Sequence, residues 1–157
     1  MKIDIINKRQ RILVTGGAGF IGGCFIRRIL RDTNSIVFNL DKLSYASDLS
    51  GIREFKNNKN HFLLKADLSN YLETEKAIIE SNPDLIIHLA AESHVDRSIE
   101  NSTPFIQSNI IGTFNILEAT RKHFNNLKFS RRESFRFLHV STDEVFGSLG
   151  KEGLFSE

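Results

Sequence analysis

Short apolar runs alternate with helical patterns along most of the chain. Five runs have the length and residue types of strands: RILVT at 11–15, which is expected to be buried, SIVFNL at 35–40, HFLLK at 61–65, LIIHL at 85–89 and FRFLHVS at 135–141. The segments between them are long enough to hold the crossover connections that parallel strands require. The pattern therefore predicts an α/β fold whose parallel sheet carries helices on both faces.

Three helices are predicted between these runs. The first, at 20–31, places four apolar side chains on one face: Ile21, Phe25, Ile29 and Leu30. The second, at 70–81, begins with Asn70 and carries Glu73 three residues later, which is the spacing of a capping box. The third is predicted from Thr103 to about residue 124, because Thr103 stands as a cap residue before a proline.

Composition narrows the functional classes. Hydrophobic residues make up 40% and charged residues 25% of the chain, which is typical of a globular protein. The net charge of +2 is too small to indicate a nucleic-acid partner, and the Arg131–Arg132 pair is interpreted as a solvated loop. The one cysteine, Cys24, excludes an intrachain disulfide and is expected to pack as a small hydrophobe. No run of ~18 apolar residues predicts a membrane span, and without a signal core the expected location is cytoplasmic.

A glycine-rich turn joins the first strand to the first helix. Gly17, Gly19 and Gly22 fit G-x-G-x-x-G, and Gly16, Gly19 and Gly22 fit G-x-x-G-x-x-G equally well. Glycines allow the tight turn and a close approach of backbone N–H groups to a pyrophosphate, while the helix N-terminus supplies a favourable dipole. The strand before the turn and the helix after it strengthen this interpretation.

Asp41 ends the second predicted strand, 19 residues beyond Gly22. A carboxylate at this point accepts hydrogen bonds from the adenosine ribose hydroxyls and repels a 2′-phosphate, which favours NAD over NADP. Lys42 follows directly and could tolerate that phosphate. The alternative is a turn without a ligand, with Asp41 capping the strand end.

The sequence therefore predicts a Rossmann-type, doubly wound domain over residues 10–157, preceded by a loose leader at 1–9. The sequence ends 16 residues after Ser141 in a loop-like stretch, whereas such a sheet usually continues further. We expect the sheet to be truncated after its fifth strand.

Ser141, Thr142, Asp143 and Glu144 follow the fifth strand, where parallel sheets form a ligand crevice. Two adjacent carboxylates there suit acid–base chemistry, since neighbouring carboxyl groups can have their pKa values pushed apart. An equally weighted alternative is that Thr142 and Asp143 cap a turn and Glu144 is solvated. His88 and His94, around the fourth strand, lack the spacing of a zinc site and are interpreted as core or supporting histidines; no metal site is predicted.

With these motifs, the chain resembles the dTDP-glucose 4,6-dehydratase family of extended short-chain dehydrogenase/reductases. Five segments carry the resemblance: TGGAGFIG at 15–22, DKLSYAS at 41–47, HLAAESHVDRSI at 88–99, SNIIGTFNILEA at 108–119 and STDEVFG at 141–147. The first segment occurs across the superfamily, while the segment after the fourth strand and the Thr-Asp-Glu segment are more specific.

The resemblance implies which residues bind NAD. Those near the pyrophosphate are Gly16, Gly19, Phe20, Ile21 and Gly22. Those around the adenosine are Asp41, Lys42, Leu43, Ser44, Asp67 and Leu68. Those along the rest of the cofactor are Leu89, Ala90, Ala91, Glu92, Ser93 and Ser108, the last standing where the family has a threonine. Ser93 and Thr142 would also contact a nucleotide-sugar substrate.

The resemblance also implies a redox-neutral reaction on dTDP-glucose. Hydride passes from sugar C4 to NAD and returns at C6, and water is lost between these steps. Thr142 would hold the 4-hydroxyl, Asp143 would protonate the departing C6 hydroxyl, and Glu144 would remove the C5 proton. The implied product is dTDP-4-keto-6-deoxyglucose, a nucleotide sugar of the rhamnose-type pathways.

Two departures from the family pattern stand out. Phe146 replaces a tyrosine, and the Tyr-x-x-x-Lys pair of the family is missing, because Tyr45 and Tyr71 are followed four residues later by Leu49 and Glu75. The C-terminal nucleotide-sugar domain of the family is also absent, and so is the tyrosine-bearing helix through which the family partly forms homodimers. The alternatives are an inactive NAD-binding fragment, a UDP-glucose 4,6-dehydratase or a UDP-sugar decarboxylase.

Overall fold

A computed structural model describes residues 9–148, 150 and 152–155. The strands of this part are β1 (Arg11–Thr15), β2 (Ile36–Asp41), β3 (His61–Lys65), β4 (Leu85–His88) and β5 (Arg136–His139). They form one parallel sheet in the order β3-β2-β1-β4-β5. All five predicted strands are confirmed, with ends that differ by no more than one or two residues. The predicted leader lies, apart from Arg9, outside the described residues.

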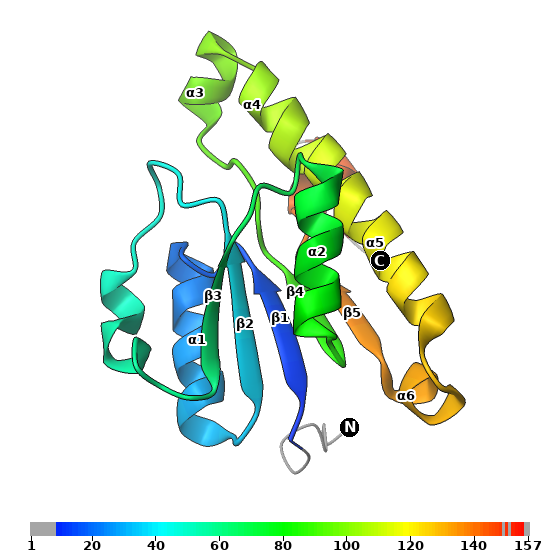
Figure 1. Ribbon diagram of the computed structural model, residues 1–157. Coiled ribbons are helices and arrows are strands. Elements are labelled where there is room, and N and C mark those ends of the chain that lie inside the picture. The colour runs from blue at the N-terminus through cyan, green and yellow to red at the C-terminus, as the bar shows by residue number, and fades with distance from the viewer. Residues whose placement is uncertain (1–8, 149, 151, 156–157) are drawn as a thin grey trace.

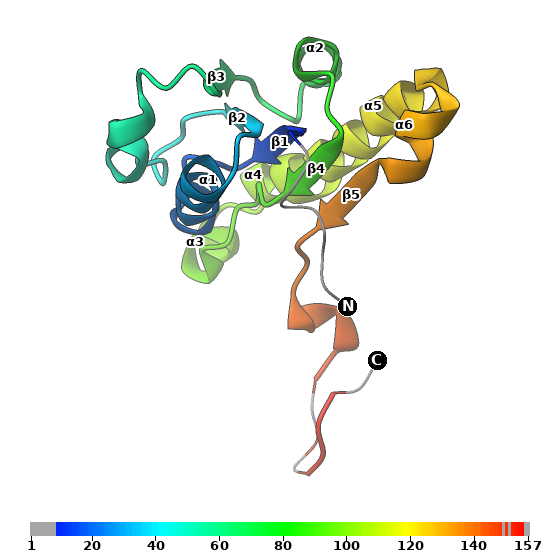
Figure 2. The same ribbon diagram turned by 90° about the horizontal axis from the view of Figure 1, so that it is seen from below.

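Helices cover both faces of the sheet, as Figures 1 and 2 show. Helices α2 (Tyr71–Ser81) and α5 (Thr113–Asn126) pack on one face, and α1 (Phe20–Asp32) and the 3-10 helix η2 (Ser50–Phe55) pack on the other. This arrangement confirms the doubly wound α/β prediction, and the strand order is that of a Rossmann sheet.

The central strand explains why the first apolar run is continuous. Successive residues of a strand point to opposite faces, so Leu13 enters the core beneath α2 and α5, while Ile12 and Val14 enter the core beneath α1. All three side chains are at most 3% exposed. A strand buried on both faces has no polar alternation to show.

The predicted apolar face of α1 is confirmed at Phe25, Ile29 and Leu30, which pack in or against the core, but not at Ile21. The buried face begins with Gly22 and continues through Ile26 and Ile29, whereas Ile21 is 64% exposed and Cys24 is exposed. The prediction was wrong for Ile21 and Cys24, because the first turn of α1 packs through Gly22, which an apolar pattern does not reveal.

The predicted long helix is confirmed but has an irregular centre. It consists of α4 (Thr103–Phe105), the π-helical segment η3 (Ile106–Gly112) and α5 in direct succession, with Ser102 rather than Thr103 as the N-cap. Gly112 ends the π-helical segment against the chain after β3, where an added Cβ would lie 3.2 Å from Leu68 Cβ. Single π-helical turns often occur at functional sites.

Two short helices were not predicted, α3 (Val95–Glu100) and α6 (Phe129–Ser134). The solvated-loop interpretation of the Arg131–Arg132 pair was wrong, because both residues belong to α6. Arg131 Nε donates to Asp84 Oδ1 at 3.0 Å and so fixes α6 to the turn before β4.

Beyond β5 the chain leaves the layers. A 3-10 helix, η4 (Asp143–Phe146), is the last helical element of the described residues, and no strand follows β5 among them. Figure 2 shows this segment, coloured orange to red, extending away from the sheet. Within the part that the structure describes, no helix has both the length and the apolar character needed to cross a bilayer.

Candidate cofactor and catalytic site

The turn after β1 lies where three strand ends meet. Gly16 has a φ of +70°, which favours glycine, and an added Cβ would lie 2.8 Å from Ala90 Cα in the chain after β4. Its N–H donates to the carbonyl of Leu40 in β2 at 2.8 Å. Gly16 therefore holds the ends of β1, β2 and β4 close together.

The N-terminus of α1 is open toward this edge. Gly22 packs directly on the turn, since an added Cβ would lie 2.2 Å from Gly16 O. The N-cap, Gly19, supplies no side-chain hydrogen bond, and the first turn carries no acidic residue. Phe20 is 95% exposed at the same end. The first N–H groups of the helix thus lack a side-chain cap, which fits the prediction that they hold an anion.

Asp41 connects this turn to the loop after β2. Its carboxylate accepts hydrogen bonds from Ala18 N at 3.0 Å, Leu43 N at 2.8 Å and Ser47 Oγ at 2.9 Å. The strand-end cap considered from the sequence is therefore present. A carboxylate offers about four lone-pair sites, so roughly one site remains for a ribose hydroxyl, and the ribose role stays a prediction.

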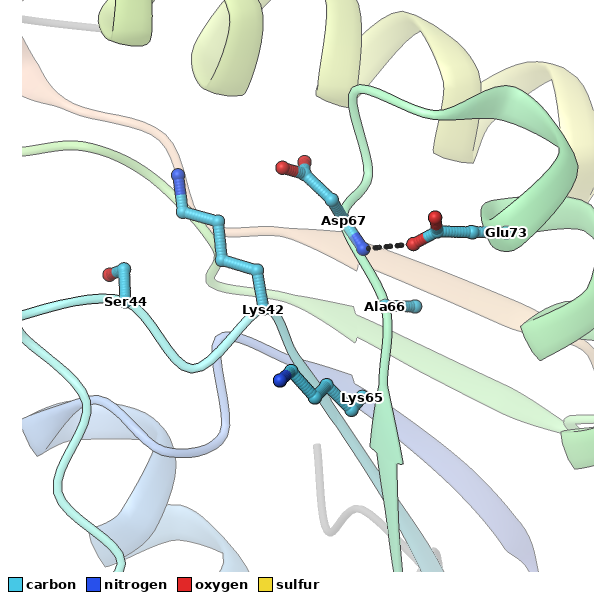
Figure 3. A pocket seen from close by; sticks show the side chains of 6 residues that line it. All are labelled: Lys42, Ser44, Lys65, Ala66, Asp67 and Glu73. Carbon is cyan, nitrogen blue, oxygen red and sulfur yellow. Dashed lines mark hydrogen bonds between the residues drawn. The ribbon is translucent and has the colours of Figure 1, made fainter.

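A pocket of about 420 Å³ opens beside Asp41 at the ends of β2 and β3, a size typical of small-molecule sites. It is lined by Lys42, Ser44, Lys65, Ala66, Asp67 and Glu73 (Figure 3). Glu73 accepts from Asp67 N at 2.8 Å and so holds the chain after β3 in place. Asp67 therefore lines this pocket, whereas Leu68 is buried in the core, and their contacts with the adenine stay predictions.

Three pocket residues were missed from the sequence: Lys65, Ala66 and Glu73. A usable signal existed for Lys65, because it ends the third apolar run just as Asp41 ends the second. In a parallel sheet with adjacent strands these ends meet, and Asp41 and Lys65 are indeed register partners. Glu73 was assigned to the capping box, a role it fills in modified form by accepting from the Asn70 side chain at 3.0 Å.

The loop after β4 is fixed by β1. Leu89 N and Ala90 N both donate to Thr15 Oγ1 at 3.2 Å. Leu89 and Ala90 are half-buried, while Ala91 and Ser93 are exposed. The structure therefore places this predicted cofactor segment directly beside the glycine turn.

Glu92, in the same loop, joins it to the loop after β2. Its carboxylate accepts from Lys42 Nζ at 2.8 Å and from Tyr45 OH at 3.3 Å. Lys42 Nζ also lies 3.4 Å from Ser108 Oγ in the π-helical segment. The predicted residues Lys42, Glu92 and Ser108 are thus brought together, although no sequence pattern indicated their contact.

His88 is a core residue, as predicted, and is 1% exposed. Thr15 Oγ1 lies 2.7 Å from its Nδ1, and Thr113 Oγ1 lies 3.0 Å from its Nε2. Since Thr15 Oγ1 already accepts two N–H groups, its proton is directed to Nδ1, and Nε2 then carries the imidazole hydrogen toward Thr113. Burial, with a smaller contribution from neighbouring His139, lowers the pKa of His88 to about 4. No group of three possible metal ligands occurs among the described residues.

The three predicted catalytic residues lie after β5 on the same edge. Val140 N donates to His88 O at 3.1 Å, which sets the start of this segment beside β4. Thr142 then caps η4 by accepting from Glu144 N at 3.3 Å and donates to Asp143 Oδ1 at 3.3 Å. The side chains of Thr142, Asp143 and Glu144 are exposed. The capping alternative is therefore present, and their catalytic roles stay predictions.

Comparison with known proteins gives the family of this fold and site. A sequence model of the family described as GDP-mannose 4,6 dehydratase matches residues 13–157. The chain belongs to this family. Within it, the expected resemblance to dTDP-glucose 4,6-dehydratases is confirmed: such an enzyme from Neisseria meningitidis serogroup B is 47% identical over 149 residues, which are 94% of this chain and 42% of that protein.

Solved structures of dTDP-glucose 4,6-dehydratases resemble this fold as well. The dTDP-glucose 4,6-dehydratase from Bacillus anthracis, in complex with NAD, has a TM-score of 0.74 and 35% identity, covering 93% of this chain and 42% of that one. The enzyme from Streptomyces venezuelae, a double mutant with NAD bound, has a TM-score of 0.77 and 32% identity, covering 92% and 42%. This chain thus spans about two fifths of the length of these relatives.

Proposed function

We propose that this chain binds NAD along the carboxyl edge of its sheet and carries the acid–base residues of a dTDP-glucose 4,6-dehydratase. The supporting observation is one continuous edge. It begins with the pocket beside Asp67, passes Asp41 and the uncapped N-terminus of α1, and reaches the segment that holds Thr142–Glu144. A dinucleotide binds across this edge in Rossmann sheets.

Different residues along that edge are proposed to contact different parts of NAD. In the proposal, Asp67 and Ser44 contact the adenosine, Asp41 binds the ribose, and the first N–H groups of α1 hold the pyrophosphate. The remaining predicted contacts lie along the rest of the cofactor. Leu89, Ala90, Ala91 and Ser93 continue along the loop after β4, whereas Glu92 and Ser108 contact Lys42 beside the adenosine pocket.

The proposed reaction converts dTDP-glucose to dTDP-4-keto-6-deoxyglucose. NAD, when bound, accepts hydride from sugar C4 and returns it at C6. Thr142 hydrogen-bonds the 4-hydroxyl, whose proton would pass to the base that the Tyr-x-x-x-Lys pair supplies in the family and that this sequence lacks. Glu144 takes the C5 proton and Asp143 gives a proton to the departing C6 hydroxyl, so that water is lost; a proton returns to C5 when hydride reaches C6. Each transfer requires the side chain within hydrogen-bond reach of its atom. The dTDP group of the substrate belongs to this proposal through the names of the relatives. A homodimeric state and a cytoplasmic location belong to it as expectations from the sequence.

A second candidate is an NAD-binding chain without turnover. The specific observation is that neither tyrosine of the sequence is followed by a lysine four residues later. The two candidates share NAD binding, so this binding is the property to test first.

The test is titration calorimetry of the folded chain with NAD and NADP. NAD should bind more tightly. Asp41→Asn keeps an acceptor for Ala18 but removes the charge, so it should weaken NAD binding roughly 10- to 100-fold and narrow the preference, since a hydrogen bond to a charged group contributes about 1.5–3 kcal/mol.

Asp48→Asn is the matched control, because Asp48 lies in the same loop but is exposed, and within the described residues its carboxylate accepts hydrogen bonds only from Ser50. It should leave the preference unchanged. Failure of the folded parent chain to bind NAD would refute the proposal, and an unaltered preference in Asp41→Asn would refute the ribose role.

A further inference from the structure

Lys42 occupies a position where a cation could recruit NADP. It follows Asp41 directly and lines the pocket assigned to the adenosine. A 2′-phosphate on the ribose at Asp41 would therefore lie near this side chain. From the sequence alone, Lys42 weakens the preference for NAD that Asp41 predicts.

The Lys42 ammonium group is already engaged. Its Nζ donates to Glu92 Oε1 at 2.8 Å, and the Glu92 side chain is only 10% exposed. Tyr45 OH donates to the second carboxylate oxygen at 3.3 Å. The Lys42 side chain is 31% exposed, so the pair is partly buried and less weakened by screening than an ion pair on the open surface.

Glu92 is held in this position by its own backbone. Its N–H donates to Asn109 Oδ1 at 2.8 Å, and its carbonyl accepts from Asn109 Nδ2 at 2.9 Å. Asn109 lies in the π-helical segment, one residue after Ser108, which adds a 3.4 Å contact to Lys42 Nζ. The carboxylate is thus anchored at the position that engages Lys42.

The charges around the pocket point the same way. Two cations, Lys42 and Lys65, and two carboxylates, Asp67 and Glu73, line the pocket. Outside the lining, Asp41 is the register partner of Lys65 and Glu92 is the ion-pair partner of Lys42. The formal sum of these six side chains is negative. A 2′-phosphate would add further negative charge and would have to compete with Glu92 for Lys42.

We propose that Glu92 is a specificity-determining residue that acts through Lys42: by binding the ammonium group, it denies NADP a phosphate partner and reinforces selection of NAD. The inference rests on the proposed function, since it concerns the same adenosine site. It assigns selectivity to a residue on the loop after β4, in addition to the acidic residue that ends β2.

The test compares the ratio of dissociation constants for NADP and NAD, measured by calorimetry on the full chain. Glu92→Gln retains the size of the side chain but removes its charge, so it should release Lys42 and lower the ratio about tenfold, the contribution of one charge-assisted hydrogen bond. Glu73→Gln is the matched control. It removes one charge from the same pocket without contacting Lys42 and should change the ratio by less than about threefold, as expected for a solvent-screened charge.

Two double variants identify the cation. Lys42→Met in the Glu92→Gln background should restore the parent ratio, whereas Lys42→Met alone should change the ratio far less, because its ammonium group is engaged there. Lys65→Met in the Glu92→Gln background should leave the ratio about tenfold below that of the parent. If Lys65→Met restores the parent ratio and Lys42→Met does not, the inference is overturned.

Other outcomes are equally decisive. An unchanged ratio in folded Glu92→Gln, or an equal fall of the ratio in Glu73→Gln, would overturn the role of Glu92. NAD binding by the parent would be unaffected by either result. If Glu92→Gln does not fold, the comparison of Lys42→Met with the parent still decides, because a rise in the ratio of about tenfold would show that Lys42 is free to bind phosphate. Absence of NAD binding by the folded parent would refute the proposed function itself.

Discussion

Acidification should destabilise this fold through one buried imidazole. His88 donates from Nε2 to Thr113 and accepts from Thr15, and it is 1% exposed. The same Thr15 hydroxyl accepts Leu89 N and Ala90 N. Protonation of Nδ1 would remove the acceptor for Thr15 and bring a charge into the core, so it should also loosen the loop that follows β4.

The magnitude follows from the pKa of His88, which burial lowers from 6.5 to about 4. The neutral imidazole is favoured in the folded state. Its contribution to stability is therefore complete above pH 6.5 and is lost as the pH falls from 6.5 toward 4. At about 1.4 kcal/mol per pKa unit, the full loss is about 3 kcal/mol, and roughly 2 kcal/mol of it should be reached by pH 5. Burial also lowers the pKa values of His61 and His123, which adds to the loss in the same direction.

The assay is urea unfolding at pH 7.5, 6 and 5 for the parent and for His88→Gln. Glutamine does not titrate, so the variant should be less stable at pH 7.5 but should lose about 2 kcal/mol less than the parent on going to pH 5. His94→Gln, which replaces an exposed histidine, should follow the parent curve. Equal pH dependence in the parent and in His88→Gln would show that the imidazole is not held neutral by the fold.

Three further predictions concern the turn and the catalytic segment. Gly22→Ala should destabilise the chain by about 1–3 kcal/mol or more and abolish NAD binding, because the added Cβ would lie 2.2 Å from Gly16 O. The control is Gly23→Ala, whose added Cβ would have contacts of 3.7 Å or longer, and which should be neutral or slightly stabilising in thermal unfolding. This chain alone, incubated with NAD and dTDP-glucose, should give no 4-keto-6-deoxy product above a no-protein control. The reason is that the Tyr-x-x-x-Lys pair, whose tyrosine is by resemblance the base for C4 oxidation, is missing from this sequence; product formation would show that another residue here acts as that base. In a chain completed with the C-terminal part of a relative, Glu144→Gln should permit C4 oxidation but block loss of water. Reduced cofactor should then accumulate, which the absorbance of its near-ultraviolet band measures. Dehydration at the parent rate would exclude Glu144 as the base.

The elements that sequence predicted well are those decided by local patterns. β1 and β3 have the predicted bounds, because a short apolar run between polar flanks has one suitable secondary structure in an alternating α/β chain. Asn70 caps α2 as expected, since its side chain can accept from Leu72 N and Glu73 N whatever the tertiary fold. The turn at Gly16–Gly22 was predictable because several glycines at fixed spacing meet a steric need.

What the sequence could not supply are contacts across the crevice. The Lys42–Glu92 pair joins residues 50 positions apart, and it exists because β1 lies between β2 and β4 in the sheet. Lys65 becomes a pocket residue only through its register with Asp41. Similarly, Arg131 was assigned to solvent because its partner Asp84 belongs to a distant turn. Pattern and spacing describe single elements, whereas these contacts depend on the order of the strands.

The two ends of the crevice differ in how they are held, and this difference bears on function. The cofactor end is tied together by its own loops, through Gly16 against Ala90, Asp41 to Ala18, and Lys42 to Glu92. The segment after β5 is fixed to β4 only at its start. Within the described residues, the side chains of Thr142, Asp143 and Glu144 hydrogen-bond only inside this three-residue stretch, and their backbone carbonyls accept only from Val145 and Gly147 of the same segment. Binding of a dinucleotide needs the first arrangement, which is in place. Proton transfer needs side chains oriented on the substrate, an effect worth about 7–11 kcal/mol of a barrier, and the described contacts do not supply that orientation. Cofactor binding and turnover are therefore expected to be separable in this chain.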